Sequence, residues 1–577
     1  MKFSEFAKQL EKLEKISSRL TITDEVAALL KKLSRDETEG GVYLLLGKLA
    51  PSYVGLEFNL GWKMILRSIS QLASIDADNI MADFKHKGDM GEVIMGLPAQ
   101  LFAAKNFSVG EVYEKLVTVA RYGGSGSQEK KVTGLAELLL SLDQLSAKFV
   151  ARIVMGHLRL GFSDKTILDA LSVVSEGDKS ARKRLDEAYQ ILPDVGLLSK
   201  KVLGEGLKQA LSDVGVEVGV PVIPALCQRL NQAVEIIEKM GEVAMERKYD
   251  GTRVQIHYKR TGFSNGKTVK TFTRSLEETS LMFPELTKIG DWIKADEVVL
   301  DCEAVGYDPE TDKILPFQMT ITRKRKHGIE AAASSVPLRF FVFDILAKNG
   351  ETLLHQPYSA RREILDRTIG TNKTLVIDET HRTTDPIELH KWHEQFLKEG
   401  FEGAVIKKWI GNYLPGRQGW NWVKIKEKEG STGKLSDTLD LIVMGYYRGR
   451  GKRSDFGLGA FLVGVRKGDL PAGRQGKILT IAKIGTGLSD EQFREIKKRL
   501  DPFVVSEKPS NYEVNGALTA DVWVEPRLVV EIAADEITIS PNHTAGVALR
   551  FPRLVKFRDD KDLGGVTTMA EIESMRR

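Results

Sequence analysis

Cysteine is almost absent from this 577-residue sequence, where Cys227 and Cys302 are its two examples. Two thiols cannot build a disulfide framework or a four-thiolate zinc site, so both classes of protein are excluded. Long apolar runs are also missing, and none approaches the roughly 20 residues that a membrane-spanning helix requires. The N-terminal residues Met1–Glu5 lack the apolar core of a signal peptide. These absences predict a cytoplasmic protein with no membrane span.

Charge of one sign does not dominate either. The 84 Lys and Arg residues against 79 Asp and Glu residues give a formal net charge of +5, which is mildly basic. This balance permits a polyanionic partner without requiring one, because local clustering of charge decides such binding. The chain is too long for a single core, and at roughly 150 residues per domain it predicts three or four domains.

The first 220 residues show a helical pattern of apolar side chains. They recur every three or four positions, as on the buried face of a helix, at Phe3, Phe6, Leu10, Leu13 and Ile16. We therefore predict an all-α domain over residues 1–220. Its glycine-rich turn at residues 123–127, followed by Lys130 and Lys131, is either a flexible linker or a backbone-amide cradle for phosphates. The block fits a grip on a nucleic-acid backbone and a plain interaction domain equally well.

Two prolines, Pro221 and Pro224, mark a boundary after which short β-rich runs alternate with helices. This alternation predicts an α+β domain over residues 221–430. The expected strands are 254–259, 298–301, 340–345 and 404–408, and the expected helices are 231–239, 358–366 and 387–398. Beyond residue 430 the strands become dense, at 439–447, 460–465, 479–484 and 528–533, which predicts a small β-barrel over residues 431–577. A short helix is expected at 570–577.

A lysine, Lys248, precedes a predicted turn at Asp250–Gly251 and a predicted strand. A lysine at a sheet edge can attack phosphorus once it has lost its proton, and burial and a nearby cation such as Arg253 lower its pKa. Locally, however, the short Lys-x-Asp-Gly pattern fits a surface hairpin as well.

Two acidic residues lie at the ends of predicted strands, Glu303 after one and Glu402 before another. Two such carboxylates can hold a hard divalent cation against phosphate oxygens, although a strand-end acid taken alone is more often simply solvated. Phe343 lies in a strongly apolar run, where a core aromatic is the default interpretation and a base-stacking platform is the alternative.

Three lysines can neutralise a triphosphate: Lys407, Lys424 and Lys426. The last two alternate with Val423 and Ile425, which predicts both ammonium groups on one face of a strand.

Six short motifs occur in order, and together they resemble the nucleotidyltransferase motifs of ATP-dependent DNA ligases. They are residues 248–253, 272–275, 301–303, 343–344, 402–407 and 422–426. The resemblance extends to residues 315–319, 322–326, 437–441, 449–453, 483–487 and 548–553, and in the N-terminal block to 124–127 and 158–161. It covers nearly the whole chain and is closest to the compact, archaeal replicative type.

The resemblance implies a helical DNA-binding domain at 1–220, an adenylation domain at 221–430 and an OB-fold at 431–577. It implies a monomeric ligase that uses ATP and Mg²⁺ to seal nicked double-stranded DNA in replication, repair or recombination. Sealing would pass through a lysyl-AMP and a 5′-adenylated DNA intermediate. A sliding clamp is a further partner by analogy with the family.

The resemblance also implies roles for individual residues. Lys248 would be the catalytic nucleophile, and Glu303 and Glu402 would serve the metal. The family often has a basic residue six positions before the first lysine of Trp-x-Lys-x-Lys, whereas this chain has Gln418 there with Arg417 beside it. The nucleotide-binding residues would be Glu246 and Phe343 at the adenine, Arg253, Arg274, Glu303 and Arg417 along the nucleotide, and Lys424 and Lys426 at its phosphates. Arg550 and Arg553 in the last motif would orient the leaving pyrophosphate.

Alternative functions share parts of this pattern. An RNA ligase or a GTP-using capping enzyme has Lys-x-Asp-Gly, but the helical N-terminal block argues against both. An NAD-dependent ligase would need a cysteine-ligated zinc module that two cysteines cannot form. A nick- or clamp-binding scaffold without catalysis is the alternative from a different class, and the joint presence of Lys248, Glu303, Glu402 and Lys424 argues against it.

Overall fold

The computed structural model describes residues 1–575 except 74, 157, 159, 231, 324–328, 427–437, 450–455, 469–475, 487 and 535. The chain divides into two compact units, Met1–Lys426 and Glu427–Arg577. Among the described residues, no helix is long and apolar enough to cross a membrane.

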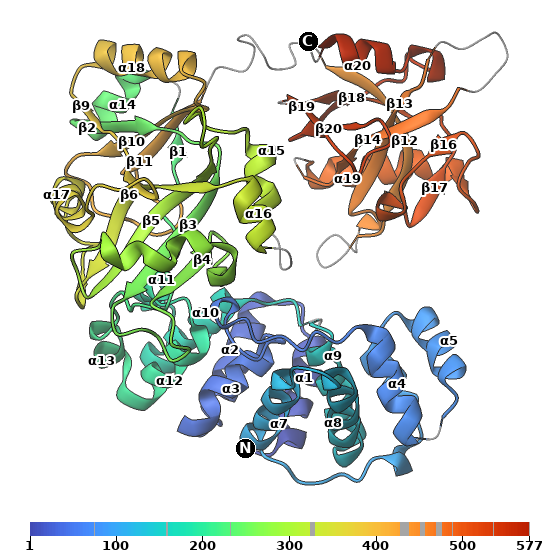
Figure 1. Cartoon of the computed structure of the whole chain (residues 1–577). Helices are drawn as coiled ribbons and strands as arrows, with labels where there is room; N and C mark the ends of the chain where they lie inside the picture. The colour runs from blue at the N-terminus through green and yellow to red at the C-terminus, as the bar shows by residue number, and fades with distance from the viewer. Residues whose placement is uncertain are drawn as a thin grey trace. The chain divides into compact units, whose positions relative to one another are not determined.

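The N-terminal part of the first unit is helical, as the apolar spacing predicts (Figure 1). Its α-helices are α1 (Phe3–Glu14), α2 (Arg19–Leu30), α3 (Arg35–Leu45), α4 (Trp62–Ala73), α5 (Ala77–Lys87), α6 (Met90–Met95), α7 (Val109–Arg121), α8 (Ser127–Ser141), α9 (Gln144–Val154), α10 (Asp164–Glu176), α11 (Arg182–Ile191), α12 (Val195–Glu205) and α13 (Leu207–Ser212). They share one hydrophobic core that begins with Phe3, Phe6 and Leu10.

Helix α7 shows how the sequence starts one of these helices. The Ser108 side chain accepts a hydrogen bond from the Glu111 amide at 3.2 Å, and the Glu111 carboxylate accepts one from the Ser108 amide at 2.7 Å. This reciprocal capping satisfies two amides that the first helical turn would leave unpaired. The same helix buries Val112 and Leu116 completely, and each such side chain contributes roughly 1.5–3 kcal/mol.

The glycine-rich turn before α8 separates the two lysines that follow it. Gly124 and Gly126 have φ of 77° and 75°, a region that favours glycine. Lys130 is exposed, but Lys131 is buried and its ammonium donates to the Phe58 carbonyl at 2.8 Å. The expectation that Lys131 helps to hold phosphates is therefore wrong, because its charge stabilises the loop that carries Phe58.

The middle of the chain contains two β-sheets. The first has the order β4-β3-β5-β6-β7, with β8 added parallel to β6. Its strands are β3 (Thr252–Lys259), β4 (Val269–Thr273), β5 (Glu297–Gly306), β6 (Leu338–Lys348), β7 (Glu351–Thr352) and β8 (Leu375–Ile377). Helix α17 (Tyr358–Thr368) packs against β6. The short helices α15 (Phe317–Thr320) and α16 (Ile329–Ser335) precede β6 in the chain.

The second sheet has the order β1-β11-β10-β2-β9. Its strands are β1 (Gln228–Arg229), β2 (Val243–Arg247), β9 (His381–Thr383), β10 (Gly403–Lys408) and β11 (Trp422–Lys426). One face forms a core with α14 (Ala233–Met240) and α18 (Pro386–Lys398), built from Ile236, Leu389, Phe396, Ile406, Val423 and Ile425 among others. The side chains of opposite parity on β10 and β11 therefore lie on the other face. The predicted strands and helices of this region are confirmed, with ends that differ by a few residues.

The second unit is rich in β-structure but does not form the predicted closed barrel. Hydrogen bonding among the described residues joins most strands in an open sheet, in the order β15-β17-β12-β13-β14-β16 with β18 on β12 and β21 on β18. The strands are β12 (Leu439–Tyr447), β13 (Ala460–Arg466), β14 (Ile478–Ile484), β15 (Val504–Val505), β16 (Tyr512–Glu513), β17 (Val522–Val524), β18 (Val529–Ala533), β19 (Glu536–Ile539), β20 (Val547–Arg550) and β21 (Arg553–Phe557). Bulges in β12, β14 and β21 curve this sheet.

Two helices complete this unit, α19 (Asp490–Leu500) and α20 (Met569–Met575). Each buries apolar side chains against the sheet, Phe493, Ile496 and Leu500 from α19 and Ile572 from α20. The helix expected at 570–577 is thus present, although its last two residues lie outside the described part.

Candidate functional site

A cleft of about 760 Å³ in the first unit is lined by residues of both central sheets. Every nucleotide-binding residue expected from the sequence lines it except Lys426, whose side chain lies outside the described part. The lining residues are the predicted nucleophile Lys248 and, from that set, Glu246, Arg253, Arg274, Glu303, Phe343, Arg417 and Lys424. Residues that are scattered over 179 positions of the chain therefore meet in one place. The basic stretches 324–326 and 450–453 are outside the described residues.

Lys248 directly follows β2 and is tied to the start of β10. Its amide donates to the Gly403 carbonyl at 3.0 Å, and its carbonyl accepts from the Glu402 amide at 3.2 Å. The ammonium forms an ion pair with the Glu402 carboxylate, and both side chains are about one-fifth exposed. The turn after Lys248 requires glycine, because a Cβ on Gly251 would lie 2.5 Å from the Ala304 carbonyl oxygen.

Glu303 lies opposite Arg253 in the antiparallel pairing of β3 and β5. Enclosure in the cleft raises the pKa of the Glu303 carboxyl from its ordinary value of 4.5 to about 7, although the charges of Arg253 and Lys248 oppose the rise. The neighbouring Asp250 and Asp301 add to it. Any further cation that enters the cleft would therefore stabilise the ionised form of the Glu303 carboxyl.

Arg253 is held by Asp301, which sequence reasoning did not single out as a partner. Its Nε and Nη2 donate to the two carboxylate oxygens of Asp301 at 3.0 and 2.6 Å, and its Nη1 donates to the Ala225 carbonyl at 2.6 Å. The Tyr413 hydroxyl also donates to Asp301, at 2.6 Å. The fully buried Asp301 raises the pKa of Arg253 and fixes its guanidinium in the cleft wall.

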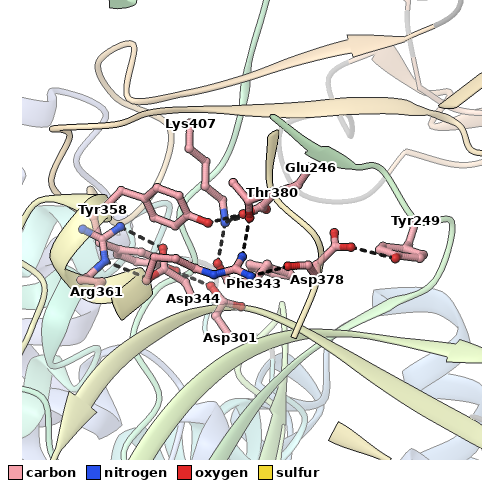
Figure 2. A network of polar contacts seen from close by, with 12 residues as sticks. Glu246, Tyr249, Asp301, Phe343, Asp344, Tyr358, Arg361, Asp378, Thr380 and Lys407 are labelled. Atoms are coloured by element: carbon pink, nitrogen blue, oxygen red, sulfur yellow. Dashed lines mark hydrogen bonds and ion pairs between the residues drawn. The ribbon is translucent and has the colours of Figure 1, made fainter. Parts of the chain in front are cut away.

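Glu246 lines the cleft and is nearly fully buried, in the network of polar contacts that Figure 2 shows. The Lys407 ammonium lies 2.9 and 2.8 Å from its two carboxylate oxygens, and the Tyr358 hydroxyl donates to one of them. Lys407 also donates to the Phe343 carbonyl at 2.6 Å and is completely buried. The expectation that Lys407 neutralises a triphosphate is therefore wrong, since its buried ammonium is held in an ion pair with Glu246.

Phe343 is half-buried and presents its ring to the cleft. It contacts Trp422 edge to face, with 5.9 Å between the ring centroids, and the Arg253 guanidinium lies 5.2 Å from its centroid. Val405, on β10, also lines the cleft. An aromatic ring and an aliphatic side chain in one cleft suit a flat heterocycle.

The strand alternation predicted for β11 is confirmed as far as Ile425, while the Lys426 side chain lies outside the described part. Val423 and Ile425 point into the core, whereas Lys424 lines the cleft. Arg274 and Arg417 are exposed cleft residues. Gln418 instead donates to the side chain of Gln190 at 2.8 Å and to the Pro415 carbonyl at 2.9 Å, so Arg417 is the basic residue that this loop offers the cleft.

Asp378 also lines the cleft, although it was not among the predicted site residues. It is almost completely buried, and it accepts a hydrogen bond from the Tyr249 hydroxyl at 2.9 Å (Figure 2). The apolar residues 375–377 directly precede Asp378, so a strand that ends in an acidic residue could have been predicted here. The same criterion identified Glu303. Strand β8 was too short to be recognised by alternation alone.

Glu303 lines the cleft, and Glu402 lies beside it next to Lys248. No group of three or more His, Cys, Asp or Glu residues placed to hold a metal occurs in the described part of the chain. Glu402 is paired with Lys248, and the charge of Lys248 also acts on Glu303. Two carboxylates with phosphate oxygens and water form the kind of set that Mg²⁺ prefers.

Three family models match the sequence in chain order. They are the "DNA ligase N terminus" at residues 2–172, the "ATP dependent DNA ligase domain" at 224–426 and the "ATP dependent DNA ligase C terminal region" at 454–561. The cleft lies within the second match.

Full-length relatives agree with these matches. The chain is 38% identical to a probable DNA ligase of Dictyoglomus turgidum, covering 100% of this chain and 98% of the relative. It is 35% identical to a DNA ligase of Hyperthermus butylicus, covering 100% and 97%. A solved structure titled "Pmar-Lig_PreS3" has a similar fold, with a TM-score of 0.54, 18% identity and coverage of 96% of this chain and 99% of that one. The chain therefore belongs to the family of ATP-dependent DNA ligases, enzymes that seal nicks in DNA.

Proposed function

We propose that the cleft around Lys248 performs nick sealing in three transfers of one AMP group. The proposal rests on one observation, that residues of complementary chemistry meet at a single cleft of the size of a nucleotide. The residues that line it are Lys248, Glu303, Lys424, Glu246 and Phe343, and Glu402 lies beside it, paired with Lys248. A nucleophile, two carboxylates, cations and a base platform are what phosphoryl-type transfer needs, because positioning and charge neutralisation supply most of its catalysis.

In the first step the Lys248 Nζ attacks the α-phosphorus of ATP. A P–N bond forms, the bond to the β-phosphate breaks, and pyrophosphate leaves. Before the attack the ammonium must release its proton, and the Glu402 carboxylate that already pairs with it is placed to orient the amine. In the second step a 5′-phosphate oxygen at the nick displaces Lys248 from phosphorus. In the third the 3′-hydroxyl displaces AMP and forms the phosphodiester.

The remaining roles follow from position. Glu246 accepts from the amine of the adenine and Phe343 stacks on its ring. Arg253, Arg274 and Arg417 contact the nucleotide or the 5′-phosphate of the nick. Lys424 and Lys426 hold phosphates. Mg²⁺, held by Glu303 and Glu402 with the phosphates of ATP, would supply positive charge against the oxygens that become more negative during transfer.

The proposed domains are a DNA-binding domain at 1–220, an adenylation domain at 221–430 and an OB-fold at 431–577. The curved sheet of the second unit supports the last assignment, and α19 and α20 cover part of it. Arg550 ends β20 and Arg553 begins β21, so the motif carrying both lies at one turn. We assign these two arginines to the leaving pyrophosphate.

The proposed partner is nicked double-stranded DNA, bound by backbone charge and shape rather than by sequence. The family profile for the helical block supports this partner. The proposed oligomeric state is a monomer, and the proposed second partner is a sliding clamp.

The direct test is to incubate the purified protein with Mg²⁺ and ATP labelled at the α-phosphate. Covalent label that is chased into a sealed product by nicked duplex DNA is the expected result. Because freshly purified protein can already carry AMP, it is first treated with pyrophosphate, which reverses the first step. Absence of label after that treatment would contradict the proposed function.

Replacing Glu303 by glutamine should separate catalysis from stability. We expect Glu303→Gln to slow lysyl-AMP formation by about tenfold or more, with partial recovery at high Mg²⁺. The raised pKa of Glu303 means that its ionisation costs folding free energy as pH rises from 4.5 through about 7. At a pH above this range the amide should therefore raise Tm. A fall in both Tm and rate would identify Glu303 as a structural residue instead.

Replacing Arg553 by alanine should affect the first step alone. Loss of one group that stabilises developing charge costs about 100-fold, so Arg553→Ala should form lysyl-AMP about 100-fold more slowly. Sealing of DNA that already carries the 5′-adenylate should stay near the wild-type rate. The matched control is Arg527→Ala, an exposed arginine of the same unit. Equal losses in both assays would contradict the assignment.

A further inference from the structure

The cleft has two ends of different electrostatic character. The charges that act on Glu303 are those of Arg253, Lys248, Asp301 and Asp250. The charges that act on Asp378 are those of Glu246, Arg247 and Lys407, a different set. Lys248 and Arg253 belong to the first end, where phosphates would lie, and the second end has two buried carboxyl groups, Glu246 and Asp378.

The fold places Asp378 beside the base platform. Strand β8 runs parallel to β6, with Val342 paired with Ile377. The register continues one residue further, since the Asp378 amide donates to the Val342 carbonyl at 3.2 Å. Asp378 is thereby fixed next to the strand position of Phe343, and both residues line the cleft.

The two carboxyl groups at this end have different partners. Glu246 is ion-paired with Lys407, and the contacts that it receives from Lys407 and Tyr358 leave its carboxylate with further acceptor capacity. Burial, and then the negative charge of Glu246, raise the pKa of Asp378 from 3.8 to about 7. Tyr249 donates to its Oδ1, and no described residue bonds its Oδ2. Asp378 can thus present an O–H donor beside the acceptor of Glu246.

This donor–acceptor pair matches one class of purine. Adenine carries an amine donor flanked on each side by a ring-nitrogen acceptor, whereas guanine and hypoxanthine carry a carbonyl acceptor at that position. We propose that Asp378 is a specificity-determining residue which, with Glu246, reads the amine-bearing edge of adenine and selects ATP over GTP and ITP. This inference rests on the proposed function of the cleft.

The charged and titratable groups around Asp378 come from three elements and one loop. They are Glu246 and Arg247 of β2, Lys407 of β10, Arg362 of α17, whose Nη2 donates to the Asp378 carbonyl at 2.6 Å, and Tyr249. Arg247 lies 4.0 Å from Oδ1 and favours the ionised form, against burial and Glu246. The donor is present below a pH of about 7 and is lost above it.

The test compares the rates of lysyl-nucleotide formation from α-labelled ATP and α-labelled ITP. In Asp378→Ala the rate with ATP at low substrate concentration should fall by about tenfold or more, while the rate with ITP should change little. The reason is that a site which hydrogen-bonds one base edge discriminates strongly against bases that lack this edge, and the alanine variant loses that discrimination. In the wild type the ATP-to-ITP ratio should fall as pH rises through about 7. The ratio cancels the titration of Lys248, which both substrates share.

Two further variants keep the test decisive. Asp378→Asn has nearly the same shape and an amide donor that does not titrate, so its ATP-to-ITP ratio should not vary with pH. Glu394→Gln changes an exposed carboxylate of α18, whose side chain is 55% exposed, and should behave like the wild type. Equal losses with ATP and ITP in Asp378→Ala, or a wild-type ratio independent of pH, would overturn the inference alone. A wild type that takes no label from either nucleotide would overturn the proposed function as well.

Discussion

Lys248→Ala is expected to abolish covalent labelling by α-labelled ATP and to reduce nick sealing by at least about 1000-fold, because removal of a nucleophile leaves only binding and charge stabilisation. The side chain is the amine at the centre of the cleft, paired with Glu402 and fixed by backbone hydrogen bonds to the start of β10. Alanine removes the amine and leaves those backbone bonds intact. Labelling is read on a denaturing gel, and sealing on nicked duplex DNA.

The same variant should still seal DNA that already carries the 5′-adenylate, within about tenfold of the wild type. The third transfer uses the 3′-hydroxyl as nucleophile, so it does not require the Lys248 amine. Lys248→Arg is the matched control for charge, because it keeps the cation beside Glu402 but cannot act as a nucleophile at ordinary pH. Covalent label in Lys248→Ala would place the nucleophile elsewhere in the chain.

Arg361→Met is expected to produce the largest loss of stability. Arg361 and Asp344 form an ion pair with both side chains completely buried, with Nε and Nη2 2.8 and 2.9 Å from the two carboxylate oxygens (Figure 2). Arg361 also donates to the Gln356 carbonyl at 2.6 Å. Methionine fills similar space but leaves Asp344 buried without its partner, which costs about 3–5 kcal/mol.

A loss of this size should lower the Tm of the first unit, which has 426 residues, by about 3–6 °C. The matched control on the same helix is Arg367→Met, which breaks the Arg367–Glu363 pair, whose side chains are 74% and 61% exposed. Exposed pairs contribute little, so Tm should hardly change. A similar Tm for both variants would show that Asp344 is satisfied by other groups, such as the Ile345 amide that also donates to it.

Asp344 and its neighbour Phe343 lie on opposite faces of β6. Asp344 is turned into the protein, where Arg361 holds it, while Phe343 is turned toward the cleft. Successive side chains on a strand point to opposite faces, so one strand carries both a structural ion pair and the base platform. The short motif Phe343–Asp344 therefore combines two functions of different kinds.

The sequence by itself determined much of this site. Some of its features are local patterns, which can be recognised from neighbouring residues alone. They are the helical spacing in the first 220 residues, the turn after Lys248 and the alternation of Val423, Lys424 and Ile425. The order of the motifs also identified the family, because each motif lies within a few consecutive positions. None of these inferences required knowledge of which strands are neighbours.

The tertiary structure decided which charge belongs to which partner. Lys407 and Lys424 are both lysines on adjacent strands, yet one is buried against Glu246 and the other lines the cleft. Lys131 is bound by a residue 73 positions away, and Arg253 by one 48 positions away. Asp378 lies beside Phe343 because β8 pairs with β6. A single sequence does not record such long-range pairings, because they follow from how the sheets stack and from which charge is removed from water. For the same reason the strand pattern predicted a barrel, whereas only the hydrogen-bond pairing shows an open, curved sheet among the described residues.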